Sequence, residues 1–353
     1  MIQFLEALII HMIMKLNGER TVISIYHILK GKKSFQTIQD CHLYGLETFF
    51  GTFQSLQRDF FEETVQKLIN NQYISIKHGG NEIEVTFKGK KALEQYMALS
   101  PFPKYLHGYH FQTRSVIFWK RLSLVVQTVS HLIHGHHSFY PIQRDLSVQA
   151  WVKRFLKTYS DKRLLGEKLY GELFSLLNQL PELQGKIFVS RLSAYHRIGL
   201  TNKQLAEETN RDEAYIHILF LDTLHFILME TNRAKSKYEI ISMIAPPVSN
   251  YQLTESSKAT YSLIKNGFSI ERAAKARQLK VSTIEDHIVE MALFIPEFSI
   301  DPFVDKSLQN EIMQTAAALK TKKLKPIKNK LQSKVSYFQI RLVLAKSGDR
   351  DGT

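Results

Sequence analysis

The sequence predicts a mainly α-helical fold with one small β-hairpin. Apolar residues recur at helical spacing along most of the 353-residue chain. Residues 73–77 and 82–87 instead alternate apolar and polar side chains as strands do, and His78-Gly79-Gly80-Asn81 between them suits a hairpin turn. The third observation concerns Ser269–Ile288. Two residues typical of helix starts, Ser269 and Ser282, lie on either side of a short polar turn, which indicates two helices in close succession.

The composition indicates a basic globular protein. The formal net charge is +14, and most of this excess lies beyond residue 100, which favours polyanions or anionic membranes as partners. Because Cys41 is the only cysteine, no internal disulfide can form, and we expect a cytoplasmic, nucleoid-associated location. The apolar stretch Met1–Leu16 lacks the basic start and the cleavage site of a signal peptide, so we expect a core helix there and no membrane partner.

Residues 1–100 form the first predicted domain. Helices are expected near 2–16, 21–29, 35–41 and 56–70, before the two strands, and near 90–99 after them. Helices followed by a two-stranded wing are the element order of a winged helix. The lysines that we expect near DNA phosphates in this domain are Lys30, Lys32, Lys33 and Lys77. The alternative is a solvated lysine face, because this domain is nearly neutral overall.

Residues 101–245 form a second predicted domain, which is helical throughout. A cluster of imidazoles follows one of its apolar helices: His131, His134, His136 and His137. Such a cluster can bind zinc when further ligands converge, but no nearby Glu or Cys accompanies it in the sequence. We favour imidazoles that complement the dipole at a helix end, and we expect no metal or other cofactor.

Residues 251–353 form the third predicted domain. Ser269 is expected to cap one short helix, and Ser282 with Glu285 is expected to form a capping box that starts the next. Two helices joined by a tight turn are the layout of a DNA-binding helix-turn-helix, although packed helices without nucleic acid share this geometry. The residues of the motif that we expect to contact DNA are Lys275, Arg277, Lys280, Ser282, Thr283 and His287, with Thr283, Asp286 and His287 facing outward.

A basic tail follows this motif. Residues 312–348 contain nine Lys or Arg and no Asp or Glu. Such a block is either a solvated linker or a site for a polyanion. The candidate DNA contacts in it are Lys320, Lys322, Lys323 and Lys325.

The motifs of common enzymes are missing from the sequence. The fragment Gly31-Lys32-Lys33-Ser34 lacks the leading glycine and the preceding strand of a phosphate-binding loop. No Gly-x-Ser-x-Gly or His-Glu-x-x-His is present, and the carboxylates are scattered singly rather than clustered to hold magnesium. The sequence therefore favours a protein that is not an enzyme.

Two segments resemble modules of RecQ-type helicases. Residues 20–97 resemble the winged helix of the RQC domain through Ile28–Ser34, Tyr44–Leu46, Phe60–Ile74 and Thr86–Gly89. Residues 254–345 resemble the helix-turn-helix domain at the C-terminus of some of these helicases through Phe268–Ile270, Ala273–Ala274, Ser282–Ile284, Leu324–Ile327 and Tyr337–Arg341. Because no motor lies between the two segments, the chain resembles the YpbB family of low-GC Gram-positive bacteria, whose members are encoded beside a short RecQ-like helicase.

The resemblance implies a non-catalytic DNA-binding accessory protein of a RecQ-like helicase in DNA repair or recombination, with single-strand-binding protein as a further partner. Two alternatives stay open. A transcription regulator would use the same helix-turn-helix to read bases, although Glu285 and Asp286 near the start of the second helix disfavour this. A scaffold would bind the helicase and single-strand-binding protein without contacting DNA.

Overall fold

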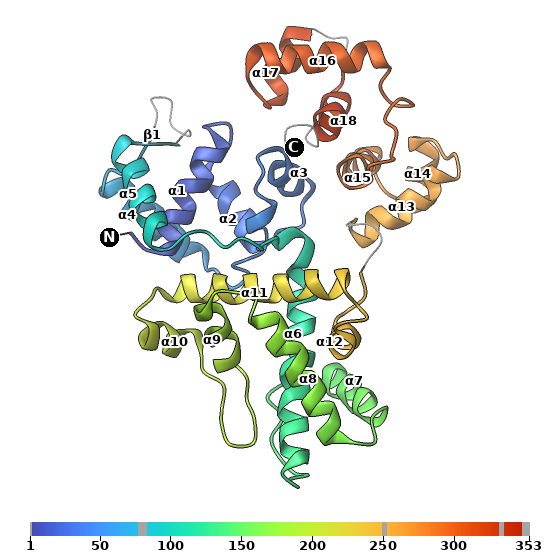
Figure 1. The fold of residues 1–353 in the computed structure, drawn as a ribbon. Coiled ribbons are helices and arrows are strands. Elements are labelled where there is room, and N and C mark those ends of the chain that lie inside the picture. The colour runs from blue at the N-terminus through green and yellow to red at the C-terminus, as the bar shows by residue number, and fades with distance from the viewer. Residues whose placement is uncertain (1, 77–82, 249–252, 332–334, 348–353) are drawn as a thin grey trace. The chain divides into compact units, whose positions relative to one another are not determined.

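The computed structural model describes residues 2–76, 83–248, 253–331 and 335–347. It is mainly helical, and its described part contains one two-stranded antiparallel sheet, which confirms the fold class expected from the sequence (Figure 1). Contacts divide the chain into two compact units. We call Met1–Leu8 with Lys91–Val248 the middle unit, and Ile9–Lys90 with Ser249–Thr353 the terminal unit. The domain division expected from the sequence, at 1–100, 101–245 and 251–353, stays a prediction.

The middle unit packs around one long apolar helix, α11. Ile218, Ile227 and Leu228 of this helix are fully buried, and α11 contacts α6, α9, α10 and α12. The helices of the unit are α6 (Gly108–Ile133), α7 (Leu146–Lys157), α8 (Lys162–Leu177), α9 (Glu182–Ser190), α10 (Asn202–Thr209), α11 (Glu213–Arg233) and α12 (Glu239–Ile244).

A buried polar pair on α11 anchors the segment that leads into α6. Asp222 accepts hydrogen bonds from the Tyr105 amide at 2.6 Å and from Gln184 Nε2 at 2.8 Å. One turn later, His225 Nδ1 accepts from the His107 amide at 3.1 Å. Burial raises the pKa of Asp222 to about 6 and lowers the pKa of His225 to about 3. Both side chains hold backbone donors that would otherwise be buried without partners.

Two helices of the middle unit, α6 and α11, are long and apolar enough to cross a membrane by length and composition. This is weak evidence, because the core helix of a soluble protein passes the same test. In α11, 78% of the apolar window is buried inside the protein, and in α6 the share is 39%.

The N-terminal segment of the terminal unit has the element order expected for a winged helix. β1 and β2 pair antiparallel, with Ile74 opposite Val85 and Ile76 opposite Ile83. The predicted wing tip and Lys77 lie outside the described residues. The elements are α1 (Phe4–Leu16), α2 (Val22–Lys30), α3 (Phe35–Leu43), η1 (Glu47–Phe49), α4 (Arg58–Asn70), β1 (Ile74–Ile76), β2 (Ile83–Val85) and α5 (Phe87–Leu99), with the boundary between the units running through α1 and α5.

Local features explain how two of these elements begin and end. Gly31 ends α2 in the left-handed region, at φ 69°, which favours glycine. Gly89 in the first turn of α5 leaves room for the Tyr73 carbonyl oxygen, with which a Cβ at this position would collide. The apolar stretch Met1–Leu16 forms α1, whose Leu8 and Ile9 are fully buried, as expected for a core helix.

The C-terminal segment of the terminal unit is helical in its described part. Its helices are α13 (Glu255–Lys265), α14 (Ile270–Arg277), α15 (Val281–Phe294), α16 (Lys306–Leu319), α17 (Leu324–Leu331) and α18 (Tyr337–Ser347). α15 has the most extensive packing, because it contacts α13, α14 and α18 and also α3 from the N-terminal segment. The N-terminal and C-terminal segments of the terminal unit therefore pack against each other.

We expect the buried imidazole of His225 to make the fold sensitive to acid. Its folded-state pKa of about 3 lies below the ordinary value of 6.5, so stability is fully present above pH 6.5 and is lost as the pH falls toward 3. Asp222 acts in the opposite direction because its pKa is raised. In His225→Asn the Asn side-chain oxygen can replace Nδ1 as the acceptor. We expect the fall in unfolding free energy between pH 7 and pH 4 to be about 3 kcal/mol smaller in this variant than in the wild type.

Urea unfolding of the wild type and H225N at a series of pH values measures this difference. Equal slopes of unfolding free energy against pH would show that His225 is not the group that titrates. The exposed His137→Asn variant is the control and should leave the slope unchanged.

Candidate nucleic-acid interface

The helix-turn-helix is made by α13, α14 and α15 in the terminal unit. The Ser269 hydroxyl caps α14 by accepting from the Arg272 amide at 3.2 Å, as the sequence predicts. Ala273 and Ala274 are buried on the side of α14 that faces its neighbours. Gln278 ends this helix in the left-handed region at φ 52°, and the Leu279 amide donates back to the Ala274 carbonyl oxygen at 3.0 Å.

The predicted capping box of Ser282 and Glu285 is wrong. α15 begins at Val281, with Lys280 at the N-cap position and no side-chain capping bond. The C-cap of α14 is Gln278, so the next helix can begin at Val281. A cap at Ser282 would start that helix two residues later, at Thr283. Ser282 therefore lies exposed in the first turn of α15.

His287 is buried, so the expectation that it faces outward is also wrong. It lies on the same helical stripe as Ile284, Ile288 and Met291, which packs inward. Its Nδ1 lies 2.8 Å from the Thr260 hydroxyl on α13. Burial and the nearby Arg277 guanidinium lower the pKa of His287, which favours the neutral ring.

Arg277 has a structural partner as well. Its guanidinium donates to the Thr260 hydroxyl at 2.7 Å and to the Ser256 carbonyl oxygen at 2.8 Å. These bonds fasten the end of α14 to α13. The Arg277 guanidinium is therefore bonded within the motif, whereas Lys275 and Lys280 are exposed.

Glu290 fixes the start of α13 onto α15. Its buried carboxylate accepts from the Thr254 amide and from the Ser257 hydroxyl, both at 2.5 Å. Burial raises the pKa of Glu290. α15 also contacts α3, which follows the loop that carries Lys33.

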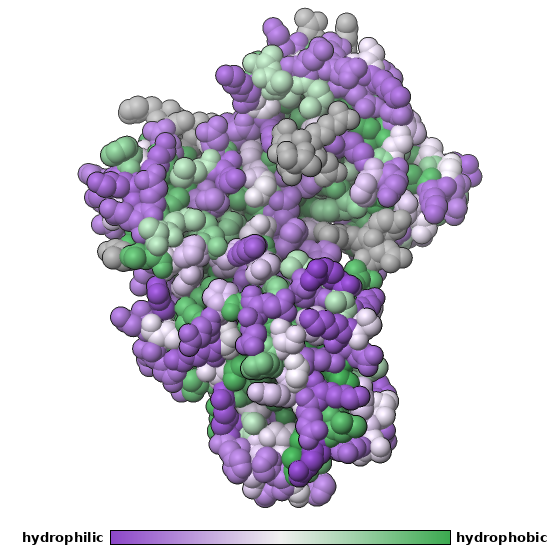
Figure 2. Space-filling view, viewed as in Figure 1, coloured by the Kyte–Doolittle hydropathy of each residue, from purple (hydrophilic) through white to green (hydrophobic). Residues whose placement is uncertain are grey.

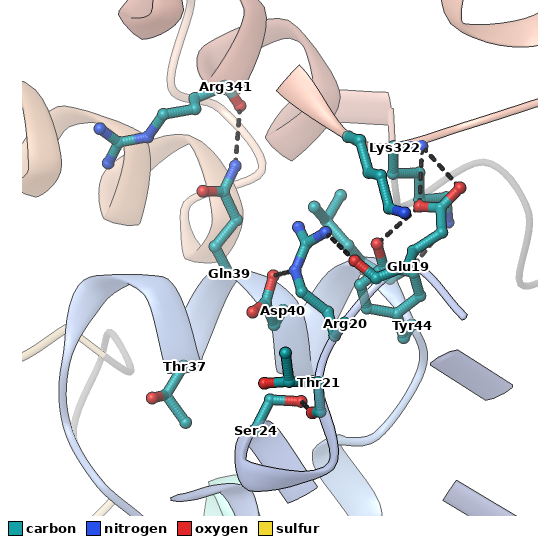
Figure 3. Close-up of polar contacts among 12 residues, drawn as sticks. Glu19, Arg20, Thr21, Ser24, Thr37, Gln39, Asp40, Tyr44, Lys322 and Arg341 are labelled. Carbon is teal, nitrogen blue, oxygen red and sulfur yellow. Dashed lines mark hydrogen bonds and ion pairs between the residues drawn. The ribbon is translucent and has the colours of Figure 1, made fainter. Parts of the chain in front are cut away.

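The other side of α15 is covered by α18 and α3. Asp286 forms an ion pair with Arg341 of α18, so this carboxylate is engaged within the protein. The Arg341 guanidinium lies 4.0 Å from the centre of the Phe35 ring. The backbone carbonyl oxygen of Arg341 accepts a hydrogen bond from Gln39 Nε2 at 3.4 Å (Figure 3). Only the first turn of the second helix is left on the surface, because every residue of 287–293 is buried.

Two exposed lysines of the motif flank the turn between α14 and α15. We call Lys275, Lys280, Val281 and Ser282 the turn surface; all four are exposed. Thr283 beside them is half-buried. The N-terminus of α15 has no side-chain cap, so its first amides and its dipole favour an anion such as a DNA phosphate. Of the residues that the motif predicts, Lys275, Lys280 and Ser282 are thus exposed, near the end of α14 and the start of α15.

The N-terminal lysines form a second cationic group. Lys32 and Lys33 are exposed in the loop between α2 and α3, and Lys30 at the end of α2 is half-buried. Because this loop leads into α3, which contacts α15 in the same compact unit, its charges add to the positive field around the helix-turn-helix.

The described part of the basic tail is mostly helical, and Lys322 in it is bonded to the N-terminal segment. The Lys322 amide donates to the Glu19 carboxylate at 2.9 Å, and Lys322 Nζ donates to the Leu43 carbonyl oxygen at 2.5 Å (Figure 3). Glu19 also accepts from the Tyr44 hydroxyl at 2.7 Å. These bonds tie the loop before α17 to the N-terminal segment.

Three neighbouring lysines differ in exposure. Lys320 at the end of α16 and Lys325 on α17 are exposed, and Lys323 is half-buried. The surface over α16 and α17 is largely hydrophilic (Figure 2). Lys320 and Lys325 are therefore the candidate DNA contacts of the tail that the fold leaves on the surface.

The comparisons with known proteins agree with this architecture. A family model described as a helix-turn-helix domain matches residues 256–344, which include α14, α15, all but the first residue of α13, and α18 up to residue 344. Protein YpbB of Bacillus subtilis is 33% identical over 345 residues, which cover 98% of each chain. The chain belongs to the YpbB family. No solved structure matches it. In this member of the YpbB family, the matched domain and the N-terminal segment form one compact unit.

The structural roles that sequence reasoning missed join residues far apart in the chain. Arg341 lies 55 residues from its partner Asp286, and Lys322 lies 303 residues from Glu19. No local spacing rule links such pairs. The clue in the sequence was the unusual pair of acidic residues on α15, because a carboxylate in a packed helix needs a cationic or hydrogen-bonding partner.

We expect Thr260→Val to destabilise the terminal unit by about 1–3 kcal/mol, because it leaves the buried nitrogen of His287 and a donor of Arg277 without their shared hydroxyl. Ser262→Ala on the exposed face of the same helix is the matched control and should cost little. Denaturant unfolding of the two variants measures the difference. Equal effects would contradict a structural role for this network.

Proposed function

We propose that this protein is a non-catalytic DNA-binding accessory protein of a RecQ-like helicase in DNA repair or recombination. The observation that carries the DNA-binding part is the helix-turn-helix, whose exposed turn surface combines two lysines with an uncapped helix N-terminus. The net charge of +14 supports the same ligand class.

The packing of α15 supports binding to the DNA backbone rather than reading of bases. A base-reading helix needs a free face along the major groove. Here one side of α15 packs on α13 and the other on α18 and α3, and Asp286 is paired with Arg341. The first turn alone can approach DNA, where its amides and Lys280 suit a phosphate. A sequence-specific transcription regulator is the weaker proposal for this reason.

The helicase partnership rests on the resemblance of residues 20–97 and 254–345 to RecQ-type modules. Residues 20–90 of the first segment and the whole of the second belong to the same compact unit, which is compatible with one combined module that is supplied to a motor on another chain. Single-strand-binding protein is a further partner under this proposal. A scaffold that contacts no DNA is the competing proposal.

Titration of the purified full chain against forked, duplex and single-stranded DNA, with and without the RecQ-like helicase, tests the proposal. We expect affinity to fall steeply with salt, because binding to phosphates releases counterions. We also expect a stimulation of unwinding when the helicase is present. No binding to any of the three DNAs would favour the scaffold, and a large preference for one operator sequence would favour the regulator.

We expect the double variant Lys275→Glu/Lys280→Glu to bind duplex DNA at least about tenfold more weakly, because it replaces two attractions to phosphate by repulsion. The salt dependence should become shallower by about one unit of slope for each lysine replaced. Lys265→Glu is the matched control, since Lys265 is exposed at the end of α13, away from the turn surface. Fluorescence anisotropy at several salt concentrations measures both quantities, and an equal weakening in the double variant and the control would refute a specific role for the turn surface.

A further inference from the structure

A cluster of aromatic and imidazole rings in the middle unit has no role in the function proposed above. The ring cluster lies where two loops meet the end of α6, and its members are His131, His134, His136, Phe139, Tyr140, Tyr195 and His196. The His131 and Phe139 rings are stacked with their centres 4.3 Å apart. Tyr195 stacks on His134 at 4.7 Å and lies 4.3 Å from the ring of His136.

Hydrogen bonds to α6 hold both loops in place. The Gln127 side chain donates to the Tyr140 carbonyl oxygen at 3.1 Å and accepts from the Ile142 amide at 2.9 Å. The Tyr195 amide donates to the Ser130 hydroxyl at 3.1 Å. Because each loop is fixed by side chains of one rigid helix, the rings are preorganised, and a ligand would lose little entropy in using them.

An open cavity of about 720 Å³ lies between the two loops and is lined by members of the cluster together with Arg197 and Ile198. Tyr140 at its edge is 97% exposed. Arg197 and His196 are exposed as well. The site thus combines a free aromatic face with cationic or protonatable groups, which are the parts that hold a base and its phosphate.

Two simpler roles do not account for the cluster. Among the described residues, no group of three or more His, Cys, Asp or Glu side chains is arranged to hold a metal ion. The helix-end role expected from the sequence suits His134, whose Nδ1 lies 2.8 Å from the Ser130 carbonyl oxygen. It does not explain the ring of Tyr140 or the opposite loop with Tyr195 and His196.

We propose that the ring cluster is a stacking site for single-stranded DNA. Tyr140 would stack on one base, and His196 and Arg197 would face the phosphates next to it. Stacking of this kind accepts any base, so the site would bind without sequence preference. The choice of DNA rather than RNA rests on the proposed function, whereas the stacking site uses no residue of the turn surface.

The test uses the full chain and a fluorescent oligothymidylate of about 15 nucleotides, a length that such sites accept. Tyr140→Ala/His196→Ala should weaken its binding about 5- to 30-fold, which corresponds to the loss of one stacked base. Tyr140→Phe keeps the ring and should bind as the wild type does. Folding is protected because the Tyr140 side chain is exposed and its hydrogen bond uses only the backbone.

Controls separate single-strand binding at the ring cluster from DNA binding at the turn surface. Tyr170→Ala removes another exposed tyrosine of the middle unit, on α8, and should leave oligothymidylate binding unchanged. Lys275→Glu/Lys280→Glu should impair duplex binding but keep most of the single-strand binding. The proposal is overturned if the full chain does not bind oligothymidylate at low salt, or if Tyr140→Ala/His196→Ala binds it as the wild type does. Displacement by oligouridylate at lower concentration than by unlabelled oligothymidylate would overturn the assignment to DNA.

Discussion

The terminal unit depends on the burial of α15, the second helix of its helix-turn-helix. This helix contacts α13 and α14 within the motif, and α18 and α3 outside it. Three polar residues of α15 have partners on neighbouring helices: Glu290 bonds to the start of α13, His287 lies against Thr260 of the same helix, and Asp286 pairs with Arg341 of α18. Because an unpaired buried polar group costs about 1–3 kcal/mol, these partners fix the orientation of the helix.

This constraint also limits what the motif can do with DNA. A helix whose flanks are buried cannot enter a groove along its length, so recognition must use its exposed end. That end offers amides, a helix dipole and two lysines, which bind charge and carry no information about base sequence. The arrangement is consistent with a protein that acts on many DNA sites, and it links the physical role of α15 in the core directly to the proposed mode of binding.

The sequence predicts the parts of this fold that local chemistry determines. The cap at Ser269, the end of α2 at Gly31 and the pairing of 74–76 with 83–85 follow from signals within a few residues. The position of His287 and the start of α15 were predicted wrongly. The sequence spacing allowed the second helix to start at Val281 or at Thr283. The preceding helix has its C-cap at Gln278, and the second helix starts at Val281. For His287, a polar residue on the apolar stripe faces inward because a hydroxyl from α13 meets it there.

The candidate site was harder to predict than the fold, because exposure of a lysine depends on residues far away in the sequence. Lys322 and Lys325 lie in the same basic segment, yet Glu19 and the Leu43 carbonyl oxygen engage the first and leave the second exposed. Charge counting treats the two alike. The ring cluster adds a related point, because Tyr140 and Tyr195 lie on different loops, 55 residues apart in sequence, and both loops are fixed by side chains of α6. If both the ring cluster and the turn surface bind DNA, one chain would hold a junction of duplex and single strand at two points. The second contact would then form intramolecularly, which raises the overall affinity beyond that of either weak site.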